Sequence, residues 1–238
     1  MRGGEISAGS VDAAFRAFVT DPRFPCLGGA SVVRRRTYRL FVYGALGCVE
    51  SARPFARDLS EFIQRAPTDA RIPRAFVAVF PERPPANEGA FECRLWAQLQ
   101  LLHEHDDPAA AWDPTVSEDP DDPRFSFSFG GRAFFIVGLH ARSSRLARRF
   151  RWPALVLNPH AQFERLRAEG RYARYQALIR ERDIALQGSV NPNLADFGER
   201  SEARQYSGMA TDPAWRCPFH RRVLDDRSPE TPGSSSED

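Results

Sequence analysis

Residues 125–140 read FSFSFGGRAFFIVGLH, and this stretch decides the predicted fold. Two runs rich in β-forming residues, 125–129 and 133–140, are separated only by GGR. Because a glycine pair supplies the positive φ angles of a tight turn, the stretch predicts an antiparallel β-hairpin. A further apolar run, PALVLN at 153–158, predicts another strand shortly after the hairpin.

The rest of the chain alternates between helical and extended patterns. β-forming residues predict two earlier strands, at 37–46 and 74–82. Apolar residues at helical spacing predict helices over 11–21, 51–66, 87–106, 161–170 and 172–188. Helices mixed with at least one hairpin indicate an α+β fold, a single domain in which helices flank a mixed or antiparallel sheet.

The bulk composition is that of a globular protein, with 238 residues, 42% hydrophobic and 27% charged. We expect a flexible N-terminus over residues 1–10, one domain over 11–223 and a disordered tail over 224–238. The net charge of +2 gives no reason to expect a nucleic-acid partner. The sequence has neither an apolar run of membrane-spanning length nor the apolar core of a signal peptide, so we expect a cytoplasmic protein.

Several enzyme classes are excluded by residues that the chain lacks. All 33 basic residues are arginine, so there is no lysine for a Schiff base or for a Walker motif. Neither GxGxxG nor GxSxG occurs. The four cysteines are far apart and form no CxxC pair, which disfavours a structural zinc site.

Two histidines directly follow predicted strands. His140 comes after the second strand of the hairpin, and His160 comes shortly after the run at 153–158. Residues beyond strand ends line ligand crevices in layered α/β folds, so one interpretation predicts that both histidines face one pocket. The alternative is that each is a surface or capping histidine.

The segment around His160 has the pattern of a helix start. Asn158 suits the N-cap position and Pro159 the first helical position, which places His160 in the first turn. The positive end of the helix dipole disfavours imidazolium there by about 0.3–1 kcal/mol. Because neutral imidazole is the form that binds a metal, His160 is a candidate ligand.

Three further regions contain candidate binding residues. Arg145 and Arg149 belong to an arginine cluster at 142–149, which is either an anion site or a solvated basic surface. Cys217 is either an axial thiolate ligand for haem or a buried structural cysteine. The irregular segment 186–208 offers Glu202 for a cationic substrate and Arg204 for a carboxylate.

Several segments resemble the YqcI/YcgG family. The resemblance covers roughly residues 24–220, and the segments occur in the family's order. They are FPCLGG (24–29), LWAQLQLLHEHD (95–106), FSFSFGGRAFFIVGLHARSSRLARRF (125–150), LVLNPHAQFERLR (155–167), IRERDIALQGSVNPN (179–193), SEARQYSG (201–208) and WRCPFH (215–220).

The resemblance implies a function as well as a fold. Members of the family include haem-dependent N-hydroxylases that act on guanidine or amine nitrogens, usually those of arginine or its derivatives, in pathways to specialised metabolites. We therefore expect a haem b cofactor, a small guanidine or amino-acid substrate, and O2 or peroxide as oxidant. The chain has no flavin or iron–sulfur motif, so electrons would come from an external donor.

On this basis the candidate residues receive roles. We expect His160 to be the iron ligand, with His140 as second choice and Cys217 as third. The other assignments follow from the cofactor and the substrate. Arg145 and Arg149 would hold the haem propionates, Phe134, Phe135, Phe150 and Trp152 would form apolar walls, and Glu202, Arg204 and Asp183 would bind the substrate.

Two other functions are compatible with the same residues. One is a haem-binding or sensing protein without catalysis. The other is a metal-free protein that binds an anionic partner through the arginine cluster. A di-iron oxygenase is disfavoured, because the ExxH pairs that such sites need on facing helices are absent.

Overall fold

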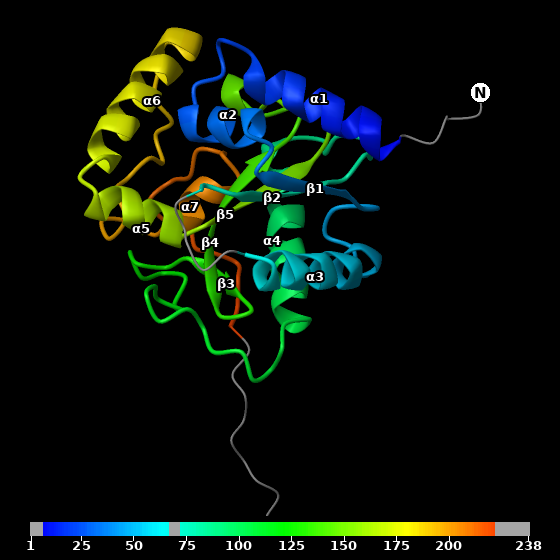
Figure 1. Cartoon of the computed structure of the whole chain (residues 1–238). Helices are drawn as coiled ribbons and strands as arrows, with labels where there is room; N and C mark the ends of the chain where they lie inside the picture. The colour runs from blue at the N-terminus through cyan, green and yellow to red at the C-terminus, as the bar shows by residue number, and fades with distance from the viewer. Residues whose placement is uncertain (1–6, 67–71, 222–238) are drawn as a thin grey trace, which may run out of the picture.

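A five-stranded sheet runs through the centre of the structure, a computed structural model that describes residues 7–66 and 72–221 (Figure 1). The strands lie in the order β1-β2-β5-β4-β3. β1 and β2 pair in parallel, and the other three pairs are antiparallel. This mixed sheet with flanking helices confirms the predicted α+β class. The strands are β1 (Tyr38–Val42), β2 (Ala75–Val79), β3 (Phe127–Phe129), β4 (Arg132–Leu139) and β5 (Ala154–Pro159).

The predicted hairpin is present as β3 and β4. Phe129 pairs with Arg132 across the turn, and Gly130 and Gly131 adopt φ angles of 56° and 70°. Two successive positive φ angles are the requirement of the tight hairpin turn that matches the twist of a sheet. The glycine pair therefore confirms the prediction for the physical reason on which it was based.

The central strands β2 and β5 are apolar because both faces of the sheet are covered. In β2, Phe76 and Ala78 belong to one hydrophobic core, whereas Val77 and Val79 belong to the other. Side chains of a strand alternate between the two faces, so a strand between two cores carries a continuous apolar sequence. The run AFVAV in β2 has this pattern.

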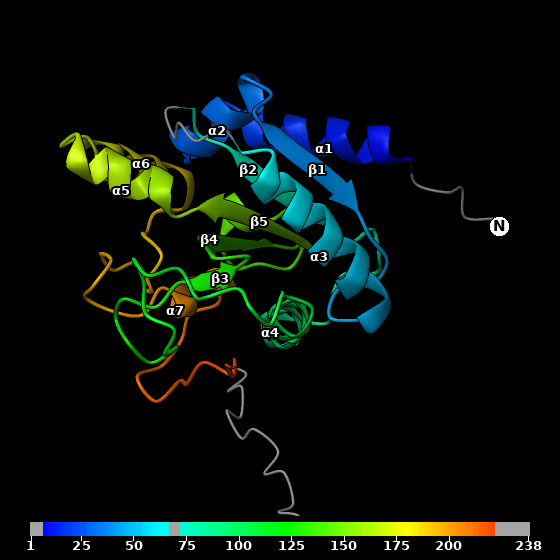
Figure 2. The ribbon, with the colours of Figure 1, turned by 60° about the horizontal axis from the view of Figure 1, so that its bottom comes forward.

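Helices cover both faces of the sheet. α1 and α2 lie on one face, and α3 and α4 on the other (Figure 2). None of the described helices has the length and apolar character needed to cross a membrane. The helices are α1 (Ala8–Thr20), α2 (Leu27–Arg34), α3 (Val49–Gln64), α4 (Glu88–Glu104), α5 (Ala161–Ala168), α6 (Tyr172–Gln187) and α7 (Ala203–Tyr206), with the short 3-10 turn η1 at Leu146–Arg148.

The first helix begins earlier than the sequence pattern predicts. Ser7 is its N-cap, and the Ser7 side chain accepts a hydrogen bond from the backbone nitrogen of Ser10 at 3.2 Å. The prediction of a flexible segment over 1–10 is therefore wrong for 7–10, because the cap precedes the first apolar residue. The rest of that segment and the tail predicted at 224–238 lie outside the described residues.

The irregular segment after α6 packs back onto the sheet. Its short helix α7 contacts β4, and Tyr206 at the end of α7 is fully buried. The Tyr206 ring stacks on Trp96 of α4, with 5.6 Å between ring centroids. A segment without periodicity thus becomes part of the core through a few large side chains.

The close approach of α7 to β4 predicts a specific sensitivity at Gly138. A Cβ atom there would lie 2.7 Å from Phe91 Cε1, 2.8 Å from the Tyr206 carbonyl oxygen and 2.9 Å from Leu95 Cδ1. We expect Gly138→Ala to lower the free energy of unfolding by about 1–3 kcal/mol, because the core cannot accept the added volume. Urea unfolding measures this change.

Gly28→Ala is the matched control. Gly28 lies in α2, and a Cβ atom added there would meet nothing within 4 Å. Alanine favours a helix over glycine, so this variant should be neutral or more stable by roughly 0.5–1 kcal/mol. Equal stability of Gly138→Ala and the wild type would contradict the packing described here.

Candidate functional site

His160 lies at the end of β5, where the strand passes directly into α5. It is the N-cap residue of α5, and its backbone nitrogen donates to the Ala133 carbonyl at 2.8 Å. Asn158 and Pro159 still belong to β5, so the predicted cap at Asn158 is wrong by two residues. Asn158 instead donates its side-chain amide to the Phe135 carbonyl at 3.3 Å. The pairing with β4 thus extends the strand to Pro159.

The imidazole of His160 is enclosed but has no hydrogen-bond partner. The residue is 2% exposed, and neither ring nitrogen is hydrogen-bonded within the described part of the chain. The Glu164 carboxylate is the facing acid, with 3.8 Å between Nδ1 and Oε1. Buried polar atoms without a partner are rare, because each costs about 1–3 kcal/mol. Two such nitrogens on one ring mark His160 as a candidate ligand-binding residue.

The protonation state of His160 is set mainly by its burial. Loss of hydration lowers the pKa of His160, while the negative charges of Glu164 and Asp113 oppose this effect and Arg167 adds to it. The ring is therefore neutral at physiological pH, as the sequence predicts. The principal cause is burial, and not the helix dipole on which that prediction relied.

Aromatic rings and one arginine surround this end of β5. The Phe197 ring lies 4.7 Å from the His160 ring, and Phe135 and Phe163 are 5.9 Å apart. The Arg167 guanidinium lies over the Phe197 ring at 5.2 Å and pairs with Glu164 at 2.5 Å. The surroundings of His160 therefore combine aromatic rings with the Arg167 guanidinium.

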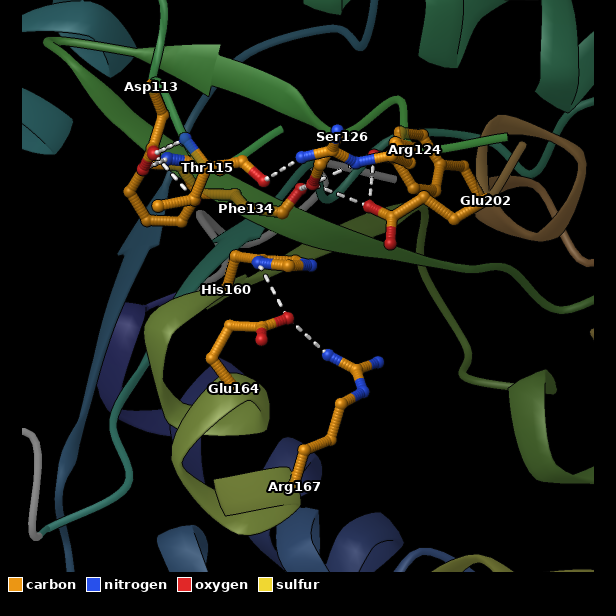
Figure 3. A network of polar contacts seen from close by, with 11 residues as sticks. Asp113, Thr115, Arg124, Ser126, Phe134, His160, Glu164, Arg167 and Glu202 are labelled. Carbon is orange, nitrogen blue, oxygen red and sulfur yellow. Dashed lines mark hydrogen bonds and ion pairs between the residues drawn. The ribbon is translucent and has the colours of Figure 1, made fainter. Parts of the chain in front are cut away.

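Glu202 is the second buried titratable group in this region (Figure 3). Its Oε1 accepts hydrogen bonds from Ser126 Oγ at 2.6 Å and from the Tyr206 hydroxyl at 2.8 Å. The residue is 6% exposed, and burial raises the pKa of Glu202 to about 7. Both hydroxyls and the positive charge of Arg167 limit this rise. A carboxyl group in this condition exchanges its proton near neutral pH.

A surface groove of about 480 Å³ runs beside the segment that carries Glu202. Ser201, which directly precedes Glu202, lies in its wall together with Asp121 and Trp215. The groove thus connects solvent to the backbone next to the buried carboxyl.

His140 lies at the opposite end of the sheet from His160. β4 and β5 are antiparallel, with Leu139 paired to Ala154 and Phe134 paired to Pro159. Five residue steps at about 3.4 Å per residue separate these two pairs. The prediction that both histidines face one pocket is therefore wrong, because residues that follow antiparallel neighbouring strands lie at opposite edges.

His140 is part of a closely packed core. Its ring stacks on Phe91 with 4.2 Å between centroids, and the residue is 0% exposed. Burial lowers the pKa of His140 to about 4, so the ring is neutral. Both of its nitrogens also lack a hydrogen-bond partner among the described residues. Its surroundings differ from those of His160, because Phe91 covers one of its faces.

The arginines assigned to propionates are used by the protein itself. Arg145 is 6% exposed, pairs with Asp183 at 2.6 Å and also donates to the Ser189 hydroxyl and carbonyl. Arg149 donates to the Ser143 carbonyl at 2.6 Å. Arg145 and Asp183 neutralise each other, so neither has its charge available for a ligand. This pairing disfavours the propionate role of Arg145 and the substrate role of Asp183, whereas Arg149 uses only its Nε–H within the described residues.

Arg204 and Cys217 also have structural surroundings. Arg204 donates to the carbonyls of Asp212, Pro213 and Trp215, and so holds the last described segment in place. Cys217 is 8% exposed, and burial raises the pKa of its thiol to about 12. A neutral buried thiol matches the alternative of a structural cysteine. These surroundings favour a structural role for both residues.

The predicted apolar walls are divided between the two faces of the sheet. Phe134 belongs to the core against α3 and α4, whereas Phe150 and Trp152 belong to the core that includes α1. Phe135 is the member of this group beside α5, through its contact with Phe163. Within residues 7–66 and 72–221, no group of three or more His, Cys, Asp or Glu side chains is arranged to hold a metal ion.

A comparison with known protein families covers most of the described fold. The family model described as the YqcI/YcgG family matches residues 15–220, from α1 to the last described segment. The chain belongs to the YqcI/YcgG family. No curated protein and no solved structure matches it.

Sequence reasoning alone did not assign three side chains near His160 in this YqcI/YcgG protein. Ser126 is 0% exposed and donates a hydrogen bond to Glu202. Asp113 accepts a hydrogen bond from the backbone nitrogen of Ala133 at 2.9 Å. Arg167 forms an ion pair with Glu164. Ser126 left a signal in the sequence, since FSFSF places serines within a strand that is otherwise apolar. Arg167 left none, because it resembles the other arginines of a surface helix.

The raised pKa of Glu202 predicts a pH-dependent contribution to stability. The ordinary pKa of 4.5 applies to the unfolded chain, and the folded value is about 7. Between these values the folded state binds more protons, so stability is lost as pH rises through this window. Glutamine cannot titrate at this position. In Glu202→Gln the change in the free energy of unfolding across this window, on the order of 3 kcal/mol, should therefore be absent.

Urea unfolding of wild type and Glu202→Gln at several pH values tests this prediction. The difference between the two free energies of unfolding should change steadily between about pH 4.5 and pH 7 and stay constant outside that window. Parallel curves for the two proteins would show that Glu202 has an ordinary pKa in the folded state.

Proposed function

We propose that this protein is a haem-dependent N-hydroxylase that acts on a guanidine nitrogen, with L-arginine or a small arginine-derived molecule as substrate. The observation that carries the proposal is the His160 imidazole, which is buried, neutral and without a hydrogen-bond partner on either nitrogen. A neutral imidazole with a free nitrogen is what iron requires of a histidine ligand. Similarity to the haem enzymes of the YqcI/YcgG family supports the same cofactor.

The residues around His160 fit a haem in part. A haem would need an iron ligand, apolar walls and a cation for its propionates from the protein. His160 would be the ligand, and Phe135, Phe163 and Phe197 would be the walls. Arg167 replaces Arg145 and Arg149 as the candidate cation, because those two arginines flank η1 after β4, at the end of the sheet opposite His160.

When bound, the haem iron would supply the transfer of one oxygen atom from O2 or peroxide to the substrate nitrogen. The role of the protein chain is to bind and orient the substrate and to exclude water from the site. Aromatic side chains at the end of β5 exclude water, and Glu202 is the nearby acidic group for a cationic substrate. An external electron donor and a cytoplasmic location complete the proposal.

Haem binding by paired histidine variants tests the cofactor. We expect the purified protein to show a Soret band with haem, and His160→Ala to lose it or to bind haem at least about tenfold more weakly, since even residues behind a metal ligand contribute that much. His140→Ala is the matched control, because it removes an equally buried imidazole at the opposite end of the sheet. An unchanged spectrum in His160→Ala would refute the assignment.

The substrate is tested on the haem-loaded protein. L-Arginine should shift the Soret band, and with O2 and reductant, or with peroxide, it should yield a hydroxylated product detected by mass spectrometry. Haem binding without such a product would favour a non-catalytic haem-binding protein. A preparation that stays colourless after haem addition would favour a metal-free protein that binds anions.

A further inference from the structure

The buried carboxyl of Glu202 is held by hydroxyl groups and not by a cation. Ser126 Oγ and the Tyr206 hydroxyl both lie within hydrogen-bond distance of Oε1, at 2.6 Å and 2.8 Å. None of the ion pairs in the described part of the chain includes Glu202. A buried carboxylate normally requires a positive partner, because its desolvation is costly. The surroundings of Glu202 therefore do not commit it to the ionised form.

Both hydroxyls have a second acceptor in common. The Phe134 carbonyl oxygen lies 3.2 Å from Ser126 Oγ and 3.3 Å from the Tyr206 hydroxyl. Each hydroxyl has one hydrogen, which points either to Glu202 or to Phe134. The Tyr206 oxygen also accepts from the backbone nitrogen of Phe127 at 3.0 Å, which fixes its position between β3 and β4.

The hydrogen bonds around Glu202 can be satisfied with its carboxyl group either ionised or protonated. If Glu202 is ionised, Ser126 and Tyr206 both donate to Oε1. If Oε1 is protonated, it donates to one of the two hydroxyl oxygens, and that hydroxyl turns its hydrogen to the Phe134 carbonyl. The change requires rotation about a C–O bond and no movement of heavy atoms.

We propose that Glu202 is a proton-exchanging residue, and that Ser126, Tyr206 and the Phe134 carbonyl form a hydroxyl switch that accommodates both its ionised and its protonated form. The free oxygen of Glu202 carries no hydrogen bond in Figure 3 and points to the side where His160, Glu164 and Arg167 lie. The carboxyl oxygen of Glu202 that lies outside the hydroxyl switch thus faces the proposed ligand-binding region.

The charged and titratable groups around Glu202 come from three elements. Tyr206 of α7 contacts it directly, and Arg167 of α5 acts on it through its charge. Arg124, which precedes β3, donates to the Thr115 carbonyl at 3.4 Å and forms no ion pair with Glu202. Because Tyr206 keeps its proton, its pKa being raised well above the ordinary value by burial, Glu202 is the group that titrates.

Proton exchange at this position has a use in the proposed reaction. Hydroxylation of a nitrogen by O2 consumes two electrons from an external reductant and two protons, and releases one water. In that reaction Glu202 would supply one of the two protons. This role in turnover rests on the proposed function, whereas the hydroxyl switch itself does not.

Glu92 provides a comparison within the same molecule. It is also a buried glutamate with a raised pKa, at 9% exposed. Its oxygens accept from Ser207 Oγ at 2.9 Å and from Trp215 Nε1 at 3.4 Å. These two donors share no alternative acceptor, and the indole nitrogen can only donate. Glu92 is therefore the matched control for a buried carboxyl without the switch.

Infrared difference spectroscopy of the full chain, without added haem, tests the switch. The carbonyl stretch of a protonated carboxyl group should disappear with a midpoint near pH 7 in the wild type. Glu202→Gln should abolish this transition, and Glu92→Gln should keep it. Ser126→Ala removes a donor to the carboxylate and should raise the midpoint by roughly 0.4–1 pH unit.

Ser126→Ala also keeps the test valid if Glu202→Gln does not fold, because it retains the titrating group. The proposal is overturned if no carboxyl band titrates between about pH 5 and pH 9, if the transition persists in Glu202→Gln, or if Ser126→Ala leaves the midpoint unchanged. Failure to bind haem would refute the proposed function and would leave these infrared results unaffected.

Discussion

The antiparallel pairing of β4 with β5 is the constraint on which the remaining structure depends. It joins the hairpin to the central strand β2 through β5, and its register runs from Phe134 opposite Pro159 to Leu139 opposite Ala154. This register extends β5 to the residue before His160, so that α5 begins at the edge of the sheet. It also sends the chain after β4 to the opposite edge. The positions of both buried histidines are consequences of this one pairing.

A second constraint is the insertion of Tyr206 beside the hairpin. Its hydroxyl accepts from the Phe127 backbone nitrogen and lies 3.3 Å from the Phe134 carbonyl, between residues that are direct partners in the β3–β4 register. The irregular C-terminal segment is thereby attached to the sheet, and Glu202 is carried with it into the core. Burial of this carboxyl group is tolerated because its Oε1 accepts hydrogen bonds from two hydroxyl groups.

Prediction from sequence succeeded where a local rule was sufficient. The glycine pair at 130–131 and the apolar run of β2 each have one physical explanation, and the structure confirms both. It failed where two distant segments had to be placed together. Arg145 looks like other surface arginines until Asp183 is found beside it. Ser126, one of the two hydroxyl partners of Glu202, is 76 residues away.

The sequence by itself determined the α+β class, the hairpin and the family. These depend on periodicity, turn chemistry and motif order, which are properties of neighbouring residues. Only the tertiary structure decided that His160 and His140 lie at opposite edges and that Glu202 is surrounded by hydroxyls. The physical reason is that strand direction and long-range burial set distances and dielectric surroundings, and neither is encoded in any single segment.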